Sequence, residues 1–311
     1  MDQEYDLAVV GAGLAGLTAA LFGARYGLKT VIVDPMGAGG QVVNAEEIAN
    51  FPGSLDGISG FDLGETVQAQ AQAAGAEVMI DEVTSITPGD PLHRLSIGNF
   101  GPSVEFGARS VIVAVGSKLR RLGVPGEQEF MGRGVSSCAS CDGPFFDNQT
   151  VCVVGGGDSA LEEALTLTHH ASRVLLVHRG EAFDGQQALV DQVLAAPSIE
   201  VRWRNELEEI KGDGTVHGVR LRDAASGQSV EEVVSGVFVY VGLEPNSSLL
   251  EGVAPLDRSG HVATDIWMRT AVPGIFAAGD VRQHSASQLV TAAGDGATAA
   301  IAAYRYVRGV E

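Results

Sequence analysis

Short, continuously apolar runs along the chain predict strands that are buried on both faces. The first run, residues 7–10, leads into a glycine-rich turn and a helix-like stretch that ends near residue 27, and a second run covers residues 30–33. Such runs are typical of a parallel sheet with helices on both sides. The pattern therefore predicts a β-α-β unit of about 30 residues.

The same order returns in the middle of the chain. Strand-like runs over residues 151–154 and 173–177 flank a second glycine turn and a helix-like stretch to about residue 170. Shorter alternating segments follow each unit, over residues 78–115 and 201–241. Alternation between turn residues is typical of antiparallel strands. We therefore expect an α/β protein with two Rossmann-like dinucleotide-binding domains, each with an antiparallel β insert.

Composition narrows the class of protein. The chain has 311 residues, of which 45% are hydrophobic and 19% charged, as in a folded globular enzyme of about two domains. Its net charge of −19 repels nucleic acids and anionic membranes, so we expect neither as a partner. The first residues lack the features of a signal peptide, and no apolar run reaches the roughly 18 to 20 residues of a membrane span. These patterns favour a cytoplasmic protein.

The first glycine turn has the pattern of a dinucleotide-binding motif. Gly11 permits the tight turn, Gly13 lets the backbone approach a pyrophosphate, and Gly16 lets the helix pack closely on the strand. Backbone N–H groups and the positive end of the helix then hold the phosphates. Asp34, 18 positions after Gly16, can accept hydrogen bonds from ribose hydroxyls. The alternative is a plain strand-to-helix turn. The whole motif is Gly11, Ala12, Gly13, Leu14, Ala15 and Gly16.

A second motif of the same kind follows the second predicted β-α-β start. It comprises Gly155, Gly156, Gly157, Asp158, Ser159 and Ala160. Two motifs in one chain indicate two dinucleotides, with electrons passing from one domain to the other. The alternative is that a duplicated domain kept its turn and lost its ligand.

Cys138 and Cys141 form a Cys-x-x-Cys motif, which can be half of a zinc site, a redox disulfide or a coincidence. A zinc site needs about four ligands, whereas Cys152 sits in an apolar run and no pair of histidines has finger-like spacing, so we expect no metal. The carboxylate of Asp142 directly follows the pair and can handle the protons that thiol–disulfide exchange moves. A redox role is favoured.

In its motifs and their order, the whole chain resembles the low-molecular-weight thioredoxin reductases. Besides the first glycine motif, the shared motifs are Gly40-Gln41, Asn50-Phe51-Pro52-Gly53, Gly123-Val124-Pro125-Gly126, Gly134-Val135-Ser136, Cys138-Ala139-Ser140-Cys141-Asp142-Gly143 and Ala277-Ala278-Gly279-Asp280-Val281. The resemblance implies an FAD domain made of residues 1–117 and 246–311, interrupted by a nicotinamide-type domain of residues 118–245 that holds the cysteines. It also implies rotation of one domain against the other, a homodimer, and thioredoxin or a similar small dithiol protein as substrate.

The resemblance also implies roles for individual residues. Cys141 corresponds to the thiol that faces the flavin, Cys138 to the thiol that attacks the partner disulfide, and Asp142 to the acid–base residue. Besides the first glycine motif and Asp34, the residues assigned in this way to FAD are Gly40, Gln41, Asn50, Ala114, Gly116, Gly279, Asp280, Gln288, Leu289 and Val290.

The second domain departs from the family after its second strand. Members that use NADPH have arginines directly after Arg179 and four positions later, where this chain has Gly180 and Asp184. Arginines hold the extra phosphate of NADPH, and each lost charge-assisted hydrogen bond costs about 1.5–3 kcal/mol, so NADPH is disfavoured. NADH is not clearly favoured either, because the strand ends in His178 and not in an acidic residue. His178 and Arg179 stay candidates, with Gly155–Ser159, for binding NADH or a second FAD.

Three functions stay open on the sequence. The first is an FAD-dependent disulfide reductase that acts on thioredoxin. The second receives its electrons from reduced ferredoxin or from a second bound flavin, and Arg120-Arg121 is the local basic patch that could attract an acidic ferredoxin to this acidic chain. The third is a flavin-binding redox sensor without turnover.

Overall fold

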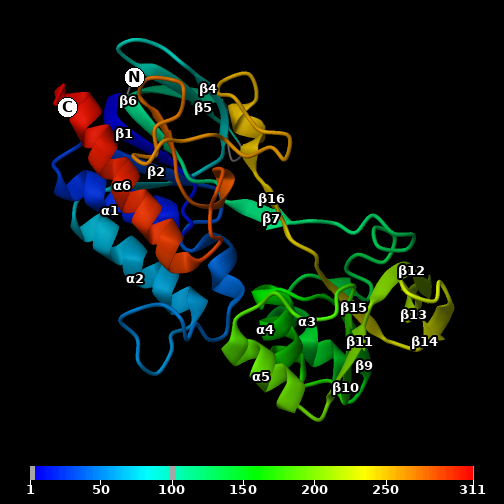
Figure 1. Ribbon diagram of the computed structural model, residues 1–311. Coiled ribbons are helices and arrows are strands. Elements are labelled where there is room, and N and C mark those ends of the chain that lie inside the picture. Colours follow the sequence, from blue (N-terminus) through cyan, green and yellow to red (C-terminus); the bar gives the residue numbers. More distant parts are fainter. Residues whose placement is uncertain (1–3, 99–102, 311) are drawn as a thin grey trace. The chain divides into compact units, whose positions relative to one another are not determined.

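The computed structural model describes residues 4–98 and 103–310, which form two compact units (Figure 1). Unit 1 comprises Met1–Lys118 and Glu244–Glu311, and unit 2 comprises Leu119–Leu243. Each unit holds a parallel sheet and an antiparallel extension or sheet, so the predicted fold class is confirmed. That unit 1 is an FAD domain and unit 2 a nicotinamide-type domain stays a prediction.

A seven-stranded sheet forms the centre of unit 1, in the order β3-β2-β1-β6-β5-β4, with β17 also paired to β6. The strands are β1 (Glu4–Val10), β2 (Thr30–Asp34), β3 (Glu77–Ile80), β4 (Val83–Thr87), β5 (His93–Ile97), β6 (Val104–Val113) and β17 (Ile275–Ala277). The first part of β6 pairs antiparallel with β5, and its last three residues pair parallel with β17. One long strand therefore joins the parallel sheet to the antiparallel insert.

The helices of unit 1 depend on small residues for their close packing. They are α1 (Leu14–Arg25), α2 (Gly60–Ala73) and α6 (Leu289–Arg308), with short 3₁₀ turns η1 (Gly40–Asn44), η3 (Ser247–Leu250) and η4 (Gly279–Val281). A Cβ atom at Gly296 of α6 would lie 2.0 Å from the Ala15 carbonyl oxygen, so only glycine permits this approach of α6 to α1. Ala299 and Ala303 continue the same buried face.

Unit 2 repeats the plan with a five-stranded parallel sheet in the order β11-β10-β9-β15-β8. The strands are β8 (Val135–Ser136), β9 (Thr150–Gly155), β10 (Arg173–His178), β11 (Ile199–Trp203) and β15 (Gly236–Tyr240). The helical segments are α3 (Ala139–Asp142), η2 (Gly143–Phe146), α4 (Asp158–Leu167) and α5 (Gln187–Ala195). Cys152 is completely buried in β9, and burial raises the pKa of its thiol to about 12, so this thiol is inert.

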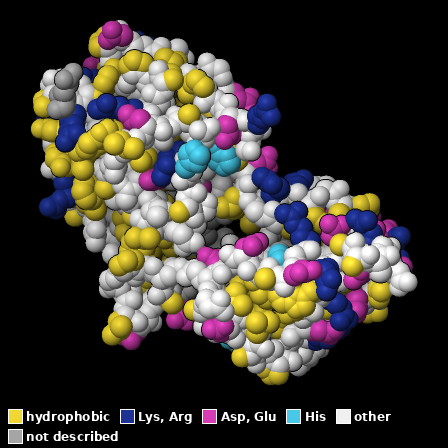
Figure 2. All heavy atoms as spheres, in the orientation of Figure 1, with side chains coloured by type: hydrophobic (Ala, Val, Ile, Leu, Met, Phe, Trp, Pro, Cys, Tyr) yellow, Lys and Arg dark blue, Asp and Glu magenta, His cyan; other side chains and the backbone are white. Residues whose placement is uncertain are grey.

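An antiparallel sheet completes unit 2, and ion pairs lie on it and on the neighbouring strands. Its strands are β12 (Asn205–Asp213), β13 (Thr215–Asp223) and β14 (Ser229–Glu232). Basic and acidic side chains are interspersed over the visible face of the molecule (Figure 2). The basic side chains of unit 2 that form ion pairs with glutamates are Arg173, Arg202, Arg204, Lys211, Arg220 and Arg222. Their positive charge is therefore compensated locally.

Two short strands, β7 (Ser117–Leu119) and β16 (Leu243–Pro245), pair where the chain passes between the units. Within residues 4–98 and 103–310, no helix has both the length and the apolar character that crossing a membrane requires.

A buried ion pair ties η4 to α6 in unit 1. The Asp295 carboxylate accepts hydrogen bonds from Arg282 Nε at 2.5 Å, from a second Arg282 nitrogen at 2.8 Å and from the Gly279 N–H at 3.1 Å. The two charged side chains are only 15% and 9% exposed. Two fixed charge-assisted bonds therefore hold the loop after β17 against the helix.

We expect Asp295→Ala to lower the free energy of unfolding of unit 1 by about 3–5 kcal/mol, because it leaves the buried Arg282 charge without its carboxylate. A Trp203→Phe background lets Trp267, the other of the two tryptophans, report unit 1 by fluorescence during urea denaturation. As a control, Glu244→Ala removes the exposed Lys118–Glu244 pair of the same unit and should cost less than about 1 kcal/mol. Equal losses in both variants would contradict the role of the buried pair.

Candidate functional site

The first glycine turn joins β1 to α1 and has the three geometric properties predicted for it. A Cβ atom at Gly11 would lie 2.5 Å from the Ala114 carbonyl oxygen, and one at Gly16 would lie 1.8 Å from the Gly11 carbonyl oxygen. Neither position therefore admits a side chain. At Gly13, by contrast, a Cβ atom would meet no atom within 4 Å, so the backbone there is open to a ligand.

Asp34, at the end of β2, is bonded to this turn. Its Oδ2 accepts a hydrogen bond from the Ala12 N–H at 2.7 Å, and its Oδ1 accepts from the N–H groups of Met36 and Gly37 at 2.8 and 3.0 Å. A carboxylate offers about four acceptor positions, so about one is left for a ribose hydroxyl. Asp34 thus fixes the loop after β2 as well as offering the predicted acceptor.

Further residues assigned to FAD lie next to the turn. A Cβ atom at Gly40 would lie 3.2 Å from the Gly13 Cα atom, so the two backbones are in contact. The Gln41 side chain donates to the Ser117 carbonyl oxygen. Gly116 has a φ of +63°, and a Cβ atom there would meet no atom within 4 Å. The segments after β2 and β6 therefore meet beside the open glycine.

The remaining residues assigned to FAD connect the C-terminal part of unit 1 to the same place. Asp280 accepts hydrogen bonds from the hydroxyls of Ser285 and Ser117 at 2.8 and 3.5 Å. Asn50 Nδ2 donates to Gln288 Oε1 at 3.5 Å. At the start of α6, Leu289 packs against the cluster around Leu14 and Val290 is 45% exposed. The structure gathers these residues in unit 1, and their contact with FAD stays a prediction.

Sequence reasoning missed two groups that shape this site. Ser117 forms hydrogen bonds with Gln41 and with Asp280 and so links their segments. Asp295 accepts a hydrogen bond from the Gly279 N–H. Nothing in its sequence neighbourhood marks Ser117. Asp295 did leave a signal, because it is the one acidic residue in the alanine-rich α6.

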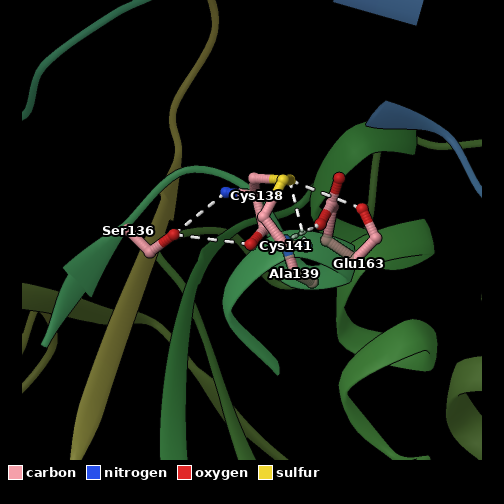
Figure 3. The surroundings of a disulfide bond; sticks show 6 residues. Ser136, Cys138, Ala139, Cys141 and Glu163 are labelled. Carbon is pink, nitrogen blue, oxygen red and sulfur yellow. Dashed lines mark hydrogen bonds between the residues drawn. A yellow bond between two sulfur atoms is a disulfide. The ribbon is translucent and has the colours of Figure 1, made fainter. Parts of the chain in front are cut away.

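In unit 2 the two motif cysteines form a disulfide. Their sulfur atoms are 2.08 Å apart and their Cα atoms 5.3 Å apart (Figure 3). Cys138 caps the N-terminus of α3, where its sulfur accepts a hydrogen bond from the Cys141 N–H at 3.2 Å and lies 3.4 Å from the Ser140 hydroxyl. Cys138 is half-buried and Cys141 is exposed. The redox interpretation of the pair fits, because sulfurs bonded to each other are not metal ligands.

A carboxylate from another helix reaches the disulfide turn. Glu163 of α4 accepts a hydrogen bond from the buried Ala139 N–H at 2.6 Å (Figure 3). The buried Tyr240 side chain lies close by. Burial, and then the Glu163 carboxylate, raise the pKa of the Tyr240 hydroxyl far above its ordinary value, so this group stays protonated. Neither residue stood out in the sequence, where Glu163 is one of many helical glutamates.

The second glycine turn repeats the geometry of the first. A Cβ atom at Gly155 would lie 2.3 Å from the Tyr240 carbonyl oxygen, and the buried Ala160 occupies the third packing position. At Gly157 a Cβ atom would meet no atom within 4 Å. Asp158, also predicted at this site, accepts hydrogen bonds from the N–H and side-chain amide of Gln186 at 2.7 and 2.9 Å. The second glycine turn is therefore as open as the first. The loop that contains Gln186 is bonded to Asp158 beside it.

His178 occupies in unit 2 the strand-end position that Asp34 occupies in unit 1. Its ring is 8% exposed, its Nε2 donates to the Ala182 carbonyl oxygen at 2.9 Å, and it packs against Phe183 and Trp203. A Cβ atom at Gly156 would lie 2.2 Å from His178 Nδ1. His178 therefore fills the space next to the turn.

The loop after β10 presents carboxylates to the solvent. Arg179, Glu181 and Asp184 are exposed, and the Asp184 N–H donates to the Gly156 carbonyl oxygen at 2.9 Å. Arg204 lies 3.5 Å from Glu181 and has a φ of +57°. A Cβ atom at Gly180 would lie 2.5 Å from His178 Nε2, so this backbone position has little room for an arginine.

Comparison with known proteins identifies the family. A family model described as pyridine nucleotide-disulphide oxidoreductase matches residues 5–296. A thioredoxin reductase of Listeria innocua is 43% identical over 98% of this chain and 95% of its own length, and one of Treponema pallidum is 42% identical over 99% and 98%. A solved structure of Lactococcus lactis thioredoxin reductase superposes with a TM-score of 0.95 at 38% identity, covering 98% of this chain and 100% of that one. A chain so similar along nearly its whole length belongs to the low-molecular-weight thioredoxin reductases, a family of FAD-dependent disulfide oxidoreductases.

Proposed function

We propose that this chain holds FAD in unit 1 and passes electrons through the Cys138–Cys141 disulfide to the disulfide of thioredoxin or a similar small dithiol protein. The observation behind this proposal is the preformed disulfide of unit 2, with an exposed Cys141, in a chain whose unit 1 keeps an open glycine turn. A dithiol that cycles in this way needs a reducing compartment, as the cytoplasm is.

The residues of unit 1 fit FAD. The free space at Gly13 admits a pyrophosphate to the backbone N–H groups at the start of α1. Asp34 has an acceptor for the ribose, and Asp280, Gln288 and the Gly40-Gln41 segment surround the same turn. When bound, FAD supplies the electron pair that reduces the disulfide.

The protein's own groups then perform thiol–disulfide exchange. The Cys138 thiolate attacks one sulfur of the partner's disulfide, and the other partner sulfur leaves as a thiolate and takes up a proton. Cys141 attacks the Cys138 sulfur of this mixed disulfide, releases the second partner thiol and re-forms the Cys138–Cys141 bond. Two electrons and two protons thus move to the partner, and Asp142, the next residue, handles the protons.

The surface beside the disulfide supports a protein as substrate. Phe145, in the η2 turn directly after α3, is 74% exposed. A large exposed aromatic side chain is typical of the centre of a protein–protein interface. Phe146 differs, because it is buried against Phe238 and anchors the turn. We infer that Phe145 contacts the partner protein.

The assignment of the two cysteines can be tested by trapping. With a thioredoxin that keeps one active-site cysteine, activated as a mixed disulfide with thionitrobenzoate, we expect the reduced Cys141→Ser variant to form a covalent complex. The Cys138→Ser variant should form it far more slowly, because the remaining thiol is not the attacking group. The complex is measured by non-reducing electrophoresis and by release of thionitrobenzoate. Faster trapping by Cys138→Ser would reverse the two roles.

The content of flavin separates the two glycine turns. We expect one FAD per chain. Gly13 and Gly157 both have backbone angles that permit a side chain and both face open space, so valine at either position leaves the fold intact. In Gly13→Val, each phosphate hydrogen bond that the side chain blocks should weaken FAD binding by about 1 kcal/mol or more, so this variant should lose most of its FAD. Gly157→Val should keep its FAD.

The count is measured by absorbance after denaturation. Two flavins in the parent chain that fall to one in Gly157→Val would place a second FAD in unit 2.

The charges of the loop after β10 weigh against NADPH as the electron donor. Glu181 and Asp184 are exposed to solvent. At the position of Asp184, family members that use NADPH have an arginine. Arg204 forms an ion pair with Glu181. The charge near the turn repels the 2′-phosphate. We propose that NADPH binds weakly and that NADH or a reduced protein is the better donor.

Reduced ferredoxin is the second candidate donor. A solved structure from Clostridium acetobutylicum, called a ferredoxin-flavin thioredoxin reductase, is 27% identical with a TM-score of 0.53 over 99% of this chain. In unit 2, exposed Arg120 and Arg121 donate to the Leu243 carbonyl and the Gln128 side-chain oxygen, which are neutral. Neither bond neutralises a positive charge, so both guanidinium groups can attract an acidic protein.

A charge reversal tests the nucleotide preference. We expect Asp184→Arg to bind NADPH about tenfold or more tightly than the parent, because it replaces repulsion by one charge-assisted bond to the 2′-phosphate, and to bind NADH with nearly unchanged affinity. Affinity is measured by equilibrium dialysis. Asp191→Arg, on the exposed face of α5, makes the same change of net charge and is the control. An equal gain in both variants, or in neither, would contradict the assignment of this loop.

A further inference from the structure

The disulfide of unit 2 lies in a place that should favour a thiolate strongly. Cys138 caps α3, and its sulfur accepts the Cys141 N–H at 3.2 Å and lies 3.4 Å from the Ser140 hydroxyl. Donors of this kind stabilise the charged sulfur and lower its pKa. A couple with a strongly stabilised thiolate is an oxidant, since its reduced form is too stable to give electrons away. The proposed function needs the opposite property.

Glu163 opposes this stabilisation. Its carboxylate binds the N–H of Ala139, the residue next to Cys138, at 2.6 Å and so takes up one of the donors at the start of α3. It also brings a negative charge to the buried side of the disulfide turn. Glu163 is half-buried and the Ala139 that it binds is fully buried, so water screens this charge only in part.

We propose that Glu163 is a positioning residue that keeps the Cys138 thiolate from being over-stabilised, and thereby keeps the Cys138–Cys141 couple reducing and its attacking thiol nucleophilic. The proposal rests on the proposed function in one respect, since it takes Cys138 as the attacking thiol. An attacking thiol is most effective when its pKa lies near the ambient pH, and more acidic thiolates are weaker nucleophiles.

Other ionisable groups, on α3 and on elements near it, set the background of the experiment. Asp142 belongs to α3, Tyr240 to β15, and Glu162 and Asp158 to α4. His170 and Asp147, which lie 3.1 Å apart, flank the far end of the turn. Partial desolvation, and then the charges of Asp158 and Glu163, raise the pKa of the Glu162 carboxyl to about 7. Above pH 8 this carboxyl is therefore ionised, as a control for Glu163 must be.

The test measures the pKa of Cys138 directly. In a Cys141→Ser holoenzyme, the rate of alkylation by iodoacetamide is followed against pH by mass spectrometry of the peptide that contains Cys138, with buried Cys152 as the unreactive reference. Glu163→Gln keeps an oxygen acceptor for the Ala139 N–H but removes the charge, so we expect the pKa of Cys138 to fall by about 1. Glu162→Gln makes the same substitution one residue away and should change the pKa by less than about 0.3.

Two further measurements separate charge from packing. Glu163→Asp keeps the charge and should leave the pKa within about 0.3 of the parent value. With both cysteines present, the disulfide is equilibrated in dithiothreitol buffers at pH 6 and pH 9. Reduction takes up two electrons and two protons at pH 6, and at pH 9 a thiolate remains. We therefore expect Glu163→Gln and the parent to differ by at most about twofold at pH 6. At pH 9 the equilibrium of Glu163→Gln should approach tenfold more reduced protein, about 30 mV.

Several outcomes would overturn the proposal. They are an unchanged pKa in Glu163→Gln, an equal change in Glu162→Gln, or a change in Glu163→Asp as large as that in Glu163→Gln. If Glu163→Gln does not fold, the Cys138 pKa of the protein that keeps Glu163 still tests the proposal. A value below about 7 would contradict it, because the thiolate would then be strongly stabilised despite Glu163. Alkylation needs neither the electron donor nor thioredoxin, so failure of the proposed function leaves these results readable.

Discussion

The close approach of backbone to backbone at the two glycine turns is the constraint on which both units depend. Gly11 lies against the Ala114 carbonyl and Gly155 against the Tyr240 carbonyl, each at a distance that a Cβ atom would violate. Each contact brings the turn after the first strand against the end of a neighbouring strand. The start of the helix is then held at the sheet edge, and the next motif position, Gly13 or Gly157, faces open space. A side chain at the tight position would close the very opening that a dinucleotide needs.

The two units share this constraint and differ in the chemistry beside it. In unit 1 the Asp34 carboxylate binds the Ala12 N–H and still has an acceptor to offer. In unit 2 the buried His178 ring packs against Gly156 and bonds to the loop that follows. The two units thus share the backbone geometry of an open turn and differ in the strand-end side chain and in the loop that follows it. Unit 2 therefore keeps the open turn although the loop beside it presents carboxylates to the solvent.

The fold could be predicted from the sequence because its signals are local. Buried parallel strands appear as apolar runs, and the tight turns require glycine at fixed spacing, so both β-α-β units and both antiparallel segments were visible. The Cys-x-x-Cys spacing likewise matched the observed disulfide. The contacts of Glu163 with Ala139 and of Asp295 with Gly279 could not be predicted in this way. Each joins residues from separate elements, and the three-dimensional packing that brings them together leaves no periodic trace. His178 was visible as a strand-end residue, but its burial depends on Phe183 and on Trp203 of the next strand.

The family membership favours an enzyme over a redox sensor. In unit 2, one helix, α4, connects the open glycine turn to the disulfide turn. The helix begins at the open glycine turn with Asp158 and reaches Glu163 five residues later, a rise of about 7.5 Å. Ala160, packed on Gly155 in the first turn of α4, fixes the helix against the sheet. The same contact therefore fixes the glycine turn at the start of α4 and the Glu163 carboxylate beside the disulfide, a little over one helical turn further on. Because a packed helix moves as a rigid body, the glycine constraint also sets the position of Glu163 relative to the sheet, and the Ala139 N–H then links this carboxylate to α3.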